Sequence, residues 1–411
     1  MADRQSRQGA FPGPVYRLRA PNARIIYSPL GVSSLSRWPG KYVIGLTGNI
    51  ATGKSVVRKM LEHLGAYGID ADALAHRVMA KGAPGYPVVV KAFGHWILDE
   101  EEQVDRARLS RIVFADPKAL DRLEALIHPL VVHAVDLLIR RAKHSVVVIE
   151  AIKLLETDMA AGCDTIWVVD APENLQAKRL MHKRNLTEAA SKQRIASQPP
   201  QAAKVRAAKV VVRNDGTFDN TWEQVQTAWS KLPKPEEPLL PPPPVARPGQ
   251  IIIRRGRPQD ADEIARFITR VTHGKRHMAR QDVMAAFGEK AYLLIERDNH
   301  LAGVAGWQVE NLVTRIDELY FEPGLSMDLA IPALMDAVET ASSELQSEAS
   351  LLFLPPYLAQ HVGAWRAVGY RPQTIQGLGV RAWQEAAVES MPRGASLWFK
   401  RLREDRVLRP L

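Results

Sequence analysis

The chain has 411 residues, of which 46% are hydrophobic and 24% charged, and it carries a formal net charge of +10. This length predicts two or three domains with cores of ordinary size. No apolar run of about 18 residues and no secretory signal is visible, so we predict neither a membrane span nor export. The one cysteine, Cys163, excludes an internal disulfide and favours a reducing, cytoplasmic location.

The first 40 residues form a basic and proline-punctuated segment. They contain six arginines and one acid, without apolar periodicity, and we predict a disordered tail. Nucleic-acid binding by this tail is an alternative, but the chain shows no basic motif interleaved with aromatic residues. The basic balance of the chain therefore fits a protein that handles phosphates better than one that binds nucleic acid.

Residues 41–232 alternate apolar runs with helical patterns. The predicted strands lie at 42–46, 66–69, 145–150, 165–170 and 209–213. Helical periodicity fills the intervals at about 54–64, 71–80, 118–142, 172–184, 187–197 and 219–230. Strands that alternate with helices predict an α/β fold in which a parallel sheet is covered on both faces.

The segment between the first strand and the first helix fits the phosphate-binding loop G-x-x-x-x-G-K-[ST]. It reads Gly48-Asn49-Ile50-Ala51-Thr52-Gly53-Lys54-Ser55. Its glycines let backbone N–H groups surround phosphate oxygens, and the helix N-terminus adds partial positive charge. We therefore expect the loop to bind ATP, with Lys54 at the β- and γ-phosphates and the Ser55 hydroxyl on Mg²⁺.

Two carboxylates, Asp70 and Asp72, follow the second predicted strand, at the sheet edge where ligands bind in such folds. An aspartate at this position either caps the helix that follows or takes part in catalysis or ligand binding. In a kinase, one carboxylate would take the proton of the acceptor hydroxyl and another would order the waters of Mg²⁺. The spacing alone does not show which of the two aspartates has which role.

Four cations follow the fourth predicted strand: Lys178, Arg179, Lys183 and Arg184. They form either a solvated basic face or a lid whose arginines bind the phosphates. An arginine over the transferring phosphoryl group would stabilise its spread charge.

The ordered motifs of residues 41–232 resemble the dephospho-coenzyme A kinase family. Besides the loop, the matching segments are Asp70-Ala71-Asp72, Gly85, Phe93-Gly94, Asp105-Arg106, Phe114, Leu126-Ile127-His128-Pro129-Leu130-Val131 and Asn214-Asp215-Gly216. The resemblance implies transfer of the ATP γ-phosphate to the ribose 3′-hydroxyl of dephospho-coenzyme A. It also implies a fold of the nucleoside-monophosphate-kinase type, with a core sheet, an acceptor-binding helical region and a lid.

The resemblance also implies roles for single residues. Lys54 would bind phosphate and Asp72 would be the base. Arg179 and Arg184 would be lid arginines, and Asn214 would lie near the adenine of ATP. In addition, His128 would shape the acceptor side, unless it is a structural histidine.

Three positions depart from the family's pattern. Where the family has Pro-Leu-Leu-x-Glu, this chain has Lys153-Leu154-Leu155-Glu156, so that Lys153 replaces the proline and Glu156 comes one position early. Lys209 stands where an acid is common. These changes concern the shape of the acceptor pocket, and Lys153 could contact a phosphate of the acceptor. The alternatives are therefore a kinase for another small-molecule acceptor and a non-catalytic sensor of nucleotide or coenzyme A.

Residues 233–249 are rich in proline and include four consecutive prolines, which predicts a polyproline II spacer between domains. Residues 250–411 are then a second domain. Its predicted strands lie at 251–254, 292–296, 301–307, 316–321 and 351–354, with a helix that opens near Asp260 and another over 329–347. A turn at Asp298-Asn299 predicts a hairpin.

This second domain resembles the α+β GNAT acetyltransferase superfamily, whose members bind acetyl-coenzyme A. The matching segments are Arg254–Asp260 and Trp365–Pro372. The superfamily's glycine-containing pyrophosphate loop is absent from residues 321–330, where Asp328 would repel phosphate. The resemblance implies acyl-coenzyme A or coenzyme A as a ligand, whereas the missing loop leaves a scaffold or regulatory role as an equal alternative to catalysis.

Overall fold

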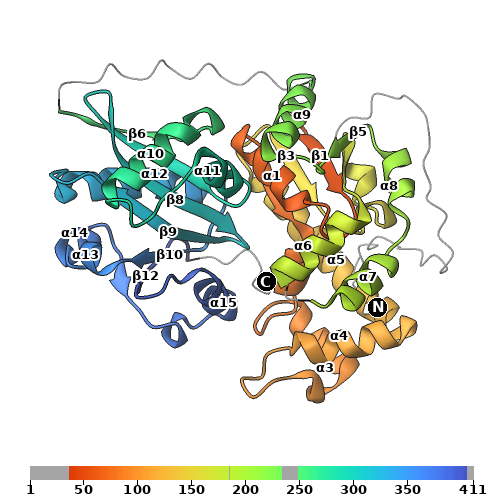
Figure 1. The fold of residues 1–411 in the computed structure, drawn as a ribbon. Coiled ribbons are helices and arrows are strands. Elements are labelled where there is room, and N and C mark those ends of the chain that lie inside the picture. The colour runs from red at the N-terminus through yellow and green to blue at the C-terminus, as the bar shows by residue number, and fades with distance from the viewer. Residues whose placement is uncertain (1–36, 185, 234–248, 405–411) are drawn as a thin grey trace, which may run out of the picture. The chain divides into compact units, whose positions relative to one another are not determined.

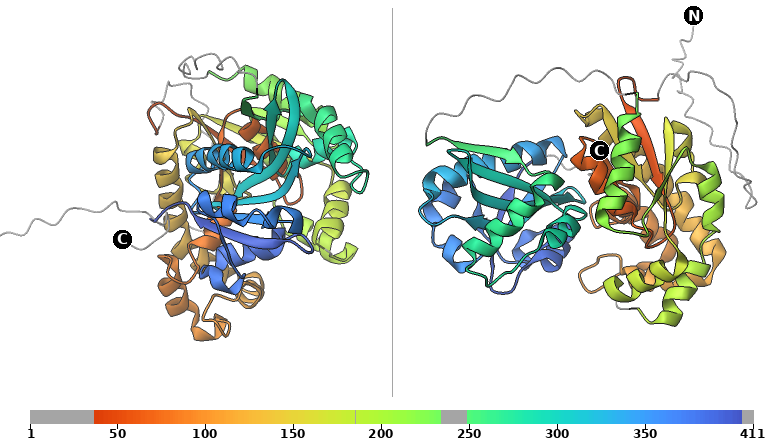
Figure 2. Two further views of the ribbon diagram at one scale, coloured as in Figure 1. Left: turned by 90° about the vertical axis from the view of Figure 1, so that its left-hand side faces the viewer. Right: turned by 45° about the horizontal axis from the view of Figure 1, so that its top comes forward.

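The computed structural model describes residues 37–184, 186–233 and 249–404, and it contains two sheets (Figures 1 and 2). We call residues 37–233 the first region and residues 249–404 the second region. Nearly all of the predicted tail and of the proline-rich spacer lies outside the described residues. No helix among these residues is long and apolar enough to cross a membrane.

The first region is built on a parallel sheet with strand order β2-β3-β1-β4-β5. Its strands are β1 (Tyr42–Thr47), β2 (Tyr67–Asp70), β3 (Val146–Glu150), β4 (Thr165–Asp170) and β5 (Val210–Arg213). All five strands predicted from the apolar runs are present, and the predicted α/β parallel sheet is confirmed.

Helices cover both faces of this sheet because successive strand residues point to opposite sides. On β3, Val147 and Ile149 join one core, whereas Val146 and Val148 join another. The first core packs against α2 (Ala71–Arg77) and α5 (Pro117–Arg141), and the second against α1 (Lys54–His63) and α9 (Phe218–Ser230).

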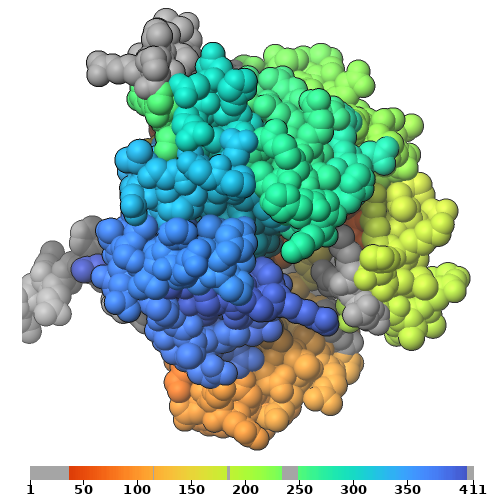
Figure 3. All heavy atoms as spheres, turned by 60° about the vertical axis from the view of Figure 1, so that its left-hand side comes forward, coloured from red at the N-terminus to blue at the C-terminus, as the bar shows by residue number. Residues whose placement is uncertain are grey.

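Three helices of the first region were not predicted: α3 (Gly85–Phe93), α4 (Arg106–Ala115) and α8 (Gln201–Ala207). They are short, with seven to ten residues each, and none carries a long apolar stripe. Asp105 caps α4 by accepting hydrogen bonds from the backbone N–H groups of Ala107 and Arg108, whereas α3 and α8 begin without a side-chain cap. The lobe that contains α3 and α4 is orange in Figure 3.

The remaining helical elements of the first region lie in the connections between strands. They are α6 (Glu173–Arg184), α7 (Glu188–Ala196) and the short 3₁₀ turns His95–Ile97, Leu154–Glu156 and Ala160–Gly162. Both α6 and α7 agree with the prediction to within a residue or two, whereas the helix predicted over 71–80 ends at Arg77.

The second region contains a mixed sheet with strand order β11-β12-β10-β9-β8-β7-β6. Its strands are β6 (Ile251–Arg255), β7 (Ala291–Arg297), β8 (His300–Glu310), β9 (Val313–Phe321), β10 (Ala349–Leu354), β11 (Arg371–Pro372) and β12 (Ser396–Arg401). The predicted hairpin between β7 and β8 is confirmed, and Asp298 and Asn299 both have positive φ angles, of 53° and 62°.

Strands β9 and β10 are the one parallel pair of this sheet, and they pair only over residues 313–316 and 349–352. Helices lie on both faces, and the 3₁₀ turns Pro258–Asp260 and Gln376–Leu378 precede two of them. The helices are α10 (Ala261–Val271), α11 (Arg280–Phe287), α12 (Met327–Glu344), α13 (Pro356–Ala359), α14 (Val362–Ala367) and α15 (Arg381–Ser390). The sequence predicted α10 and α12 but neither α15 nor β12.

Gly45, in the middle of β1, provides a test of packing around the first sheet. A Cβ at this position would lie 2.7 Å from Leu154 Cδ2, 2.8 Å from Cys163 Sγ and 2.9 Å from Ile166 Cδ1. We expect Gly45→Ala to lower the free energy of unfolding by about 1–3 kcal/mol, because the added methyl group overpacks the core. Urea denaturation would measure this, with Gly216→Ala, at an exposed glycine, as the control; equal effects of the two changes would contradict the packing.

Candidate active site

The phosphate-binding loop joins β1 to α1 in the conformation that its glycines predict. Gly48 has a φ angle of 150° and Gly53 one of 97°. A Cβ on Gly48 would lie 2.5 Å from the Val169 carbonyl oxygen, and one on Gly53 would lie 2.0 Å from Asn214 Nδ2. Gly48 therefore requires glycine because of close backbone approach, and Gly53 because of its left-handed φ angle and the nearby Asn214 side chain. The buried Lys54 curls back, and its Nζ donates to the Asn49 carbonyl oxygen at 3.2 Å.

Glu150, the last residue of β3, holds the first turn of α1. Its Oε1 accepts a hydrogen bond from Ser55 Oγ at 2.8 Å, and its Oε2 accepts one from Arg58 Nε at 2.7 Å. The residue is only 4% exposed. No role was predicted for Glu150 from the sequence, although a single charge at the end of a fully apolar strand is a recognisable signal.

The structure separates the roles of the two aspartates. Asp70 is the N-cap of α2, and its Oδ1 accepts from the backbone N–H of Ala73 at 2.8 Å. Asp72 lies in the first turn of α2, and its Oδ2 accepts from the backbone N–H of Ile152 at 3.1 Å. The helix-capping role thus belongs to Asp70, while Asp72 faces the chain that leaves β3.

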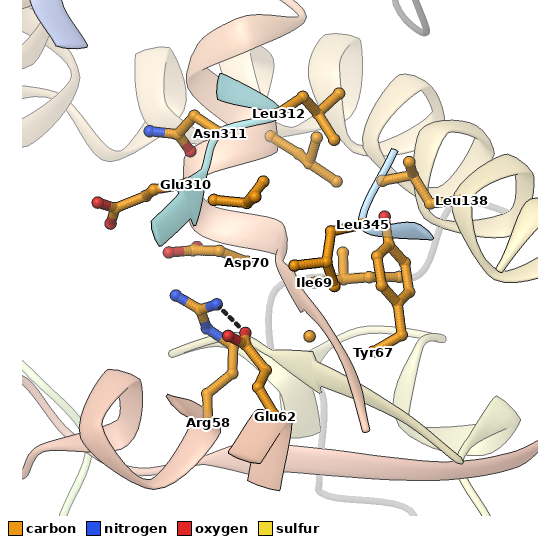
Figure 4. A pocket seen from close by; sticks show the side chains of 13 residues that line it. Arg58, Glu62, Tyr67, Ile69, Asp70, Leu138, Glu310, Asn311, Leu312 and Leu345 are labelled. Atoms are coloured by element: carbon orange, nitrogen blue, oxygen red, sulfur yellow. Dashed lines mark hydrogen bonds and ion pairs between the residues drawn. The ribbon is translucent and has the colours of Figure 1, made fainter. Parts of the chain in front are cut away.

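Burial perturbs both carboxyl groups. It raises the pKa of Asp70 to about 6; the nearby Glu150 carboxylate also raises this pKa, and Arg58 lowers it. Burial also raises the pKa of Asp72, against the attraction of Lys54. Figure 4 shows Asp70 beside the Arg58 guanidinium, which makes an ion pair with Glu62. Raised carboxyl pKa values beside a phosphate-binding loop mark candidate functional groups.

Arg179, from α6, lies behind the phosphate loop. Its Nη1 donates to the carbonyl oxygens of Ala51 and Thr52, at 3.2 and 3.1 Å, and its Nη2 donates to that of Asn214 at 2.8 Å. Asn214 Nδ2 donates in turn to the Thr52 carbonyl oxygen at 2.8 Å. The structure thus brings Arg179 and Asn214 to the loop, and the predicted roles of Arg179 at the phosphates and of Asn214 near the adenine stay predictions.

Arg184 is the last residue of α6, and its side chain lies outside the described part of the structure. His128 lies within α5, half-buried, and burial lowers its pKa. Lys153 forms a partly exposed ion pair with Glu124. The predicted roles of these residues on the acceptor side stay predictions.

A second set of contacts, which the sequence analysis missed, binds the segment before and within α8 to the phosphate loop. The backbone N–H of Ile50 donates to Gln198 Oε1 at 2.7 Å, and that of Asn49 donates to Gln201 Oε1 at 2.9 Å. Gln201 Nε2 also donates to the Val169 carbonyl oxygen at 2.9 Å. These glutamines gave no local signal, because their partners lie about 150 residues earlier in the chain.

These residues meet because parallel strands direct their carboxyl ends to one edge of the sheet. The strand register places Asp70 and Leu46 on either side of Glu150, and Asp170 next to Arg213. A phosphate loop, a buried carboxylate on its serine and a second carboxylate nearby define a P-loop phosphotransferase.

Comparison with known proteins gives the family. The sequence profile of the family "Dephospho-CoA kinase" matches residues 42–220. The dephospho-CoA kinase of Moorella thermoacetica is 40% identical over 195 residues, which cover 46% of this chain and 92% of the relative. That of Carboxydothermus hydrogenoformans is 39% identical over 192 residues, which cover 46% of this chain and 93% of the relative. The chain belongs to the dephospho-CoA kinase family, and the predicted resemblance of its first region is confirmed.

A solved structure of a GNAT-family acetyltransferase from Staphylococcus aureus is also similar to part of this chain. It is 14% identical, covers 38% of this chain and all of its own, and has a TM-score of 0.30.

The perturbed Asp70 carboxyl group provides a pH-dependent prediction. Because its pKa in the folded protein is about 6, above the ordinary 3.8, its protonated form contributes stability that is lost as the pH rises through 6. Asp70→Asn keeps a good N-cap and removes the buried charge. We expect this variant to be more stable than the wild type at pH 8, by on the order of 1–3 kcal/mol, and the difference to shrink toward pH 4.

Urea denaturation between pH 4 and pH 8 would measure this difference. Asp105→Asn, at the N-cap of α4, is the matched control for capping. A difference between Asp70→Asn and the wild type that does not change with pH would contradict the perturbed carboxyl group.

Proposed function

We propose that the first region transfers the γ-phosphate of ATP to the ribose 3′-hydroxyl of dephospho-coenzyme A, completing coenzyme A. The observation that carries the proposal is the meeting of the phosphate loop, the Ser55–Glu150 pair and Asp72 at one sheet edge, in a chain of this family. The geometry supports the reaction class, and the family supports the choice of acceptor.

The site also has ligands that suit Mg²⁺. Ser55 Oγ and the Glu150 carboxylate are oxygen donors at adjacent positions. Among the described residues, no three His, Cys, Asp or Glu side chains gather as a metal site, which fits an ion that takes further ligands from phosphates and water. When bound, Mg²⁺ would neutralise charge on the β- and γ-phosphates, and Ser55 and Glu150 would hold it.

In this proposal Asp72 orients the acceptor hydroxyl and accepts its proton. Asp70 is unsuited to that task, since its carboxylate caps α2. The hydrogen bond from Ile152 fixes Asp72 Oδ2, and the attraction of Lys54 favours the ionised form that a base requires. Loop N–H groups and Lys54 would bind the phosphates and stabilise the charge that spreads in the transition state.

For the second region we propose a scaffold or regulatory role. Asp328 is exposed in the first turn of α12, where a superfamily member that binds coenzyme A would present helix N–H groups to pyrophosphate. A carboxylate there repels such a ligand, which favours the scaffold or regulatory role. Binding of acyl-coenzyme A or coenzyme A by this region stays a prediction. The cytoplasmic location rests on the single cysteine and also stays a prediction.

The proposed roles of Lys54 and Asp72 can be tested by substitution. We expect Lys54→Ala and Asp72→Asn each to lower kcat by about 100-fold or more, because one removes charge stabilisation of the phosphoryl group and the other removes the base. The measurement is coenzyme A formation from ATP, Mg²⁺ and dephospho-coenzyme A, followed by mass spectrometry.

Exposed Lys192, paired with Glu188 on α7, provides a control variant, Lys192→Ala, that should keep full activity. Near-wild-type turnover by Lys54→Ala or Asp72→Asn would remove that residue from the mechanism. A wild-type chain that binds ATP and forms no coenzyme A would favour another acceptor or a sensor role.

A separate prediction concerns the Glu150 carboxylate and the Mg²⁺ requirement of the reaction. We expect Glu150→Gln to raise the Mg²⁺ concentration for half-maximal rate by about tenfold, because it removes the anionic group beside Ser55. Initial rates over a Mg²⁺ titration would measure this, with Glu156→Gln as the control and thermal unfolding as a check of folding. An unchanged Mg²⁺ requirement in a folded Glu150→Gln variant would contradict the assignment.

A further inference from the structure

Lys204, on α8, is a buried cation at the active-site edge that the proposed mechanism does not use. It is only 3% exposed, and its Nζ donates to the Ile152 carbonyl oxygen at 2.5 Å. Within the described residues, the structure records no carboxylate within 4.0 Å of this ammonium group. An ammonium group buried with a neutral oxygen as its recorded partner is costly, and a bound anion would offset that cost.

The charges around Lys204 are those of the reaction site. Burial lowers its pKa, Glu156 and Asp72 raise it, and Lys54 and Lys153 lower it. Two carboxylates and two further lysines therefore lie near enough to influence this group. Lys54, which we propose to bind phosphate, and Asp72, the proposed base, are both among them, so Lys204 lies close to the two groups between which the proposed transfer takes place.

Lys204 and Asp72 both form hydrogen bonds with the backbone of Ile152. Its N–H donates to Asp72 Oδ2 at 3.1 Å, and its carbonyl oxygen accepts from both Lys204 Nζ and Thr47 Oγ1. The Lys204 ammonium group and the proposed base Asp72 thus both bind the backbone of Ile152, two residues after the end of β3. On the other side, Gln201 fixes α8 to the loop through the Asn49 N–H, one helical turn before Lys204.

We propose that Lys204 is a second phosphate-binding lysine of this site, which binds the γ-phosphoryl group of ATP together with Lys54. The proposal rests on the kinase function proposed above. The pyrophosphate of the acceptor offers the same chemistry, but proximity to Lys54 and Asp72 favours the γ-phosphoryl group.

The test compares ligands that differ by one phosphoryl group. Isothermal titration calorimetry would measure binding of ADP, of the non-hydrolysable ATP analogue AMP-PNP and of dephospho-coenzyme A, each with Mg²⁺, to the full chain and to Lys204→Met. We expect the Kd of AMP-PNP to rise about tenfold or more and that of ADP to change less than about twofold, since ADP lacks the γ-phosphoryl group. Arg206→Met, an exposed cation on the same helix, is the matched control.

Weakened binding of dephospho-coenzyme A with unchanged AMP-PNP binding would overturn the proposal and assign Lys204 to the acceptor. Equal losses for ADP and AMP-PNP, or no loss for either, would also overturn it. Binding is measured without turnover, so this result is independent of coenzyme A formation. A wild-type chain that makes no coenzyme A would contradict the proposed function but would leave the AMP-PNP comparison valid.

Two further variants separate charge from structure. Lys204→Gln keeps a hydrogen-bond donor without charge, and Lys204→Arg keeps the charge. We expect kcat to fall about 100-fold in Lys204→Gln and to recover at least in part in Lys204→Arg, with unfolding temperatures close to the wild type. If Lys204→Gln retained full activity, Lys204 would serve only to donate a hydrogen bond to the Ile152 carbonyl oxygen, and the proposal would be wrong.

Discussion

The buried carboxylate of Glu150 is the interaction on which the active-site edge depends. It ends the strand β3 and accepts hydrogen bonds from Ser55 and Arg58, both on the first turns of the helix that follows the phosphate loop. A carboxylate that is 4% exposed requires such partners, since an unpaired buried charge is costly. The pair therefore fixes α1 to the sheet and directs the serine hydroxyl toward the place where Mg²⁺ is expected.

The other charged residues of the site, Asp70, Asp72 and Lys204, lie around Glu150 and the chain that follows it. The Glu150 carboxylate is one reason that the pKa of Asp70 is raised to about 6, after burial itself. The Asp70 carboxylate caps α2. Asp72 therefore lies in the first turn of this helix, where it accepts a hydrogen bond from the backbone N–H of Ile152. Lys204 reaches the same residue from α8. The buried cations Lys54 and Lys204 would offset the negative charge of a polyphosphate ligand at this edge.

The two regions differ in what their sheets provide for chemistry. In the first region, parallel strands bring five carboxyl ends to one edge, so residues from distant segments meet there. In the second region, the single parallel pair, β9 and β10, separates after a few residues, and the helix that follows β9 begins with an exposed aspartate in its first turn. The residues that perform phosphoryl transfer in our proposal all come from the first region.

The sequence by itself determined what is local. The phosphate loop lies within eight consecutive residues, and apolar runs marked every strand of the first sheet, because burial on both faces leaves no polar alternation. The family also followed from ordered motifs. Only the tertiary structure decided which aspartate caps the helix, that Glu150 binds Ser55 and that Gln198, Gln201 and Lys204 belong to the site. The Asp70 cap is local, but both aspartates could have formed it. The contacts of Glu150, Gln198, Gln201 and Lys204 join residues about 50 to 150 positions apart, so strand register and helix packing had to bring them together. In addition, α8 is too short for its apolar periodicity to be recognised in the sequence.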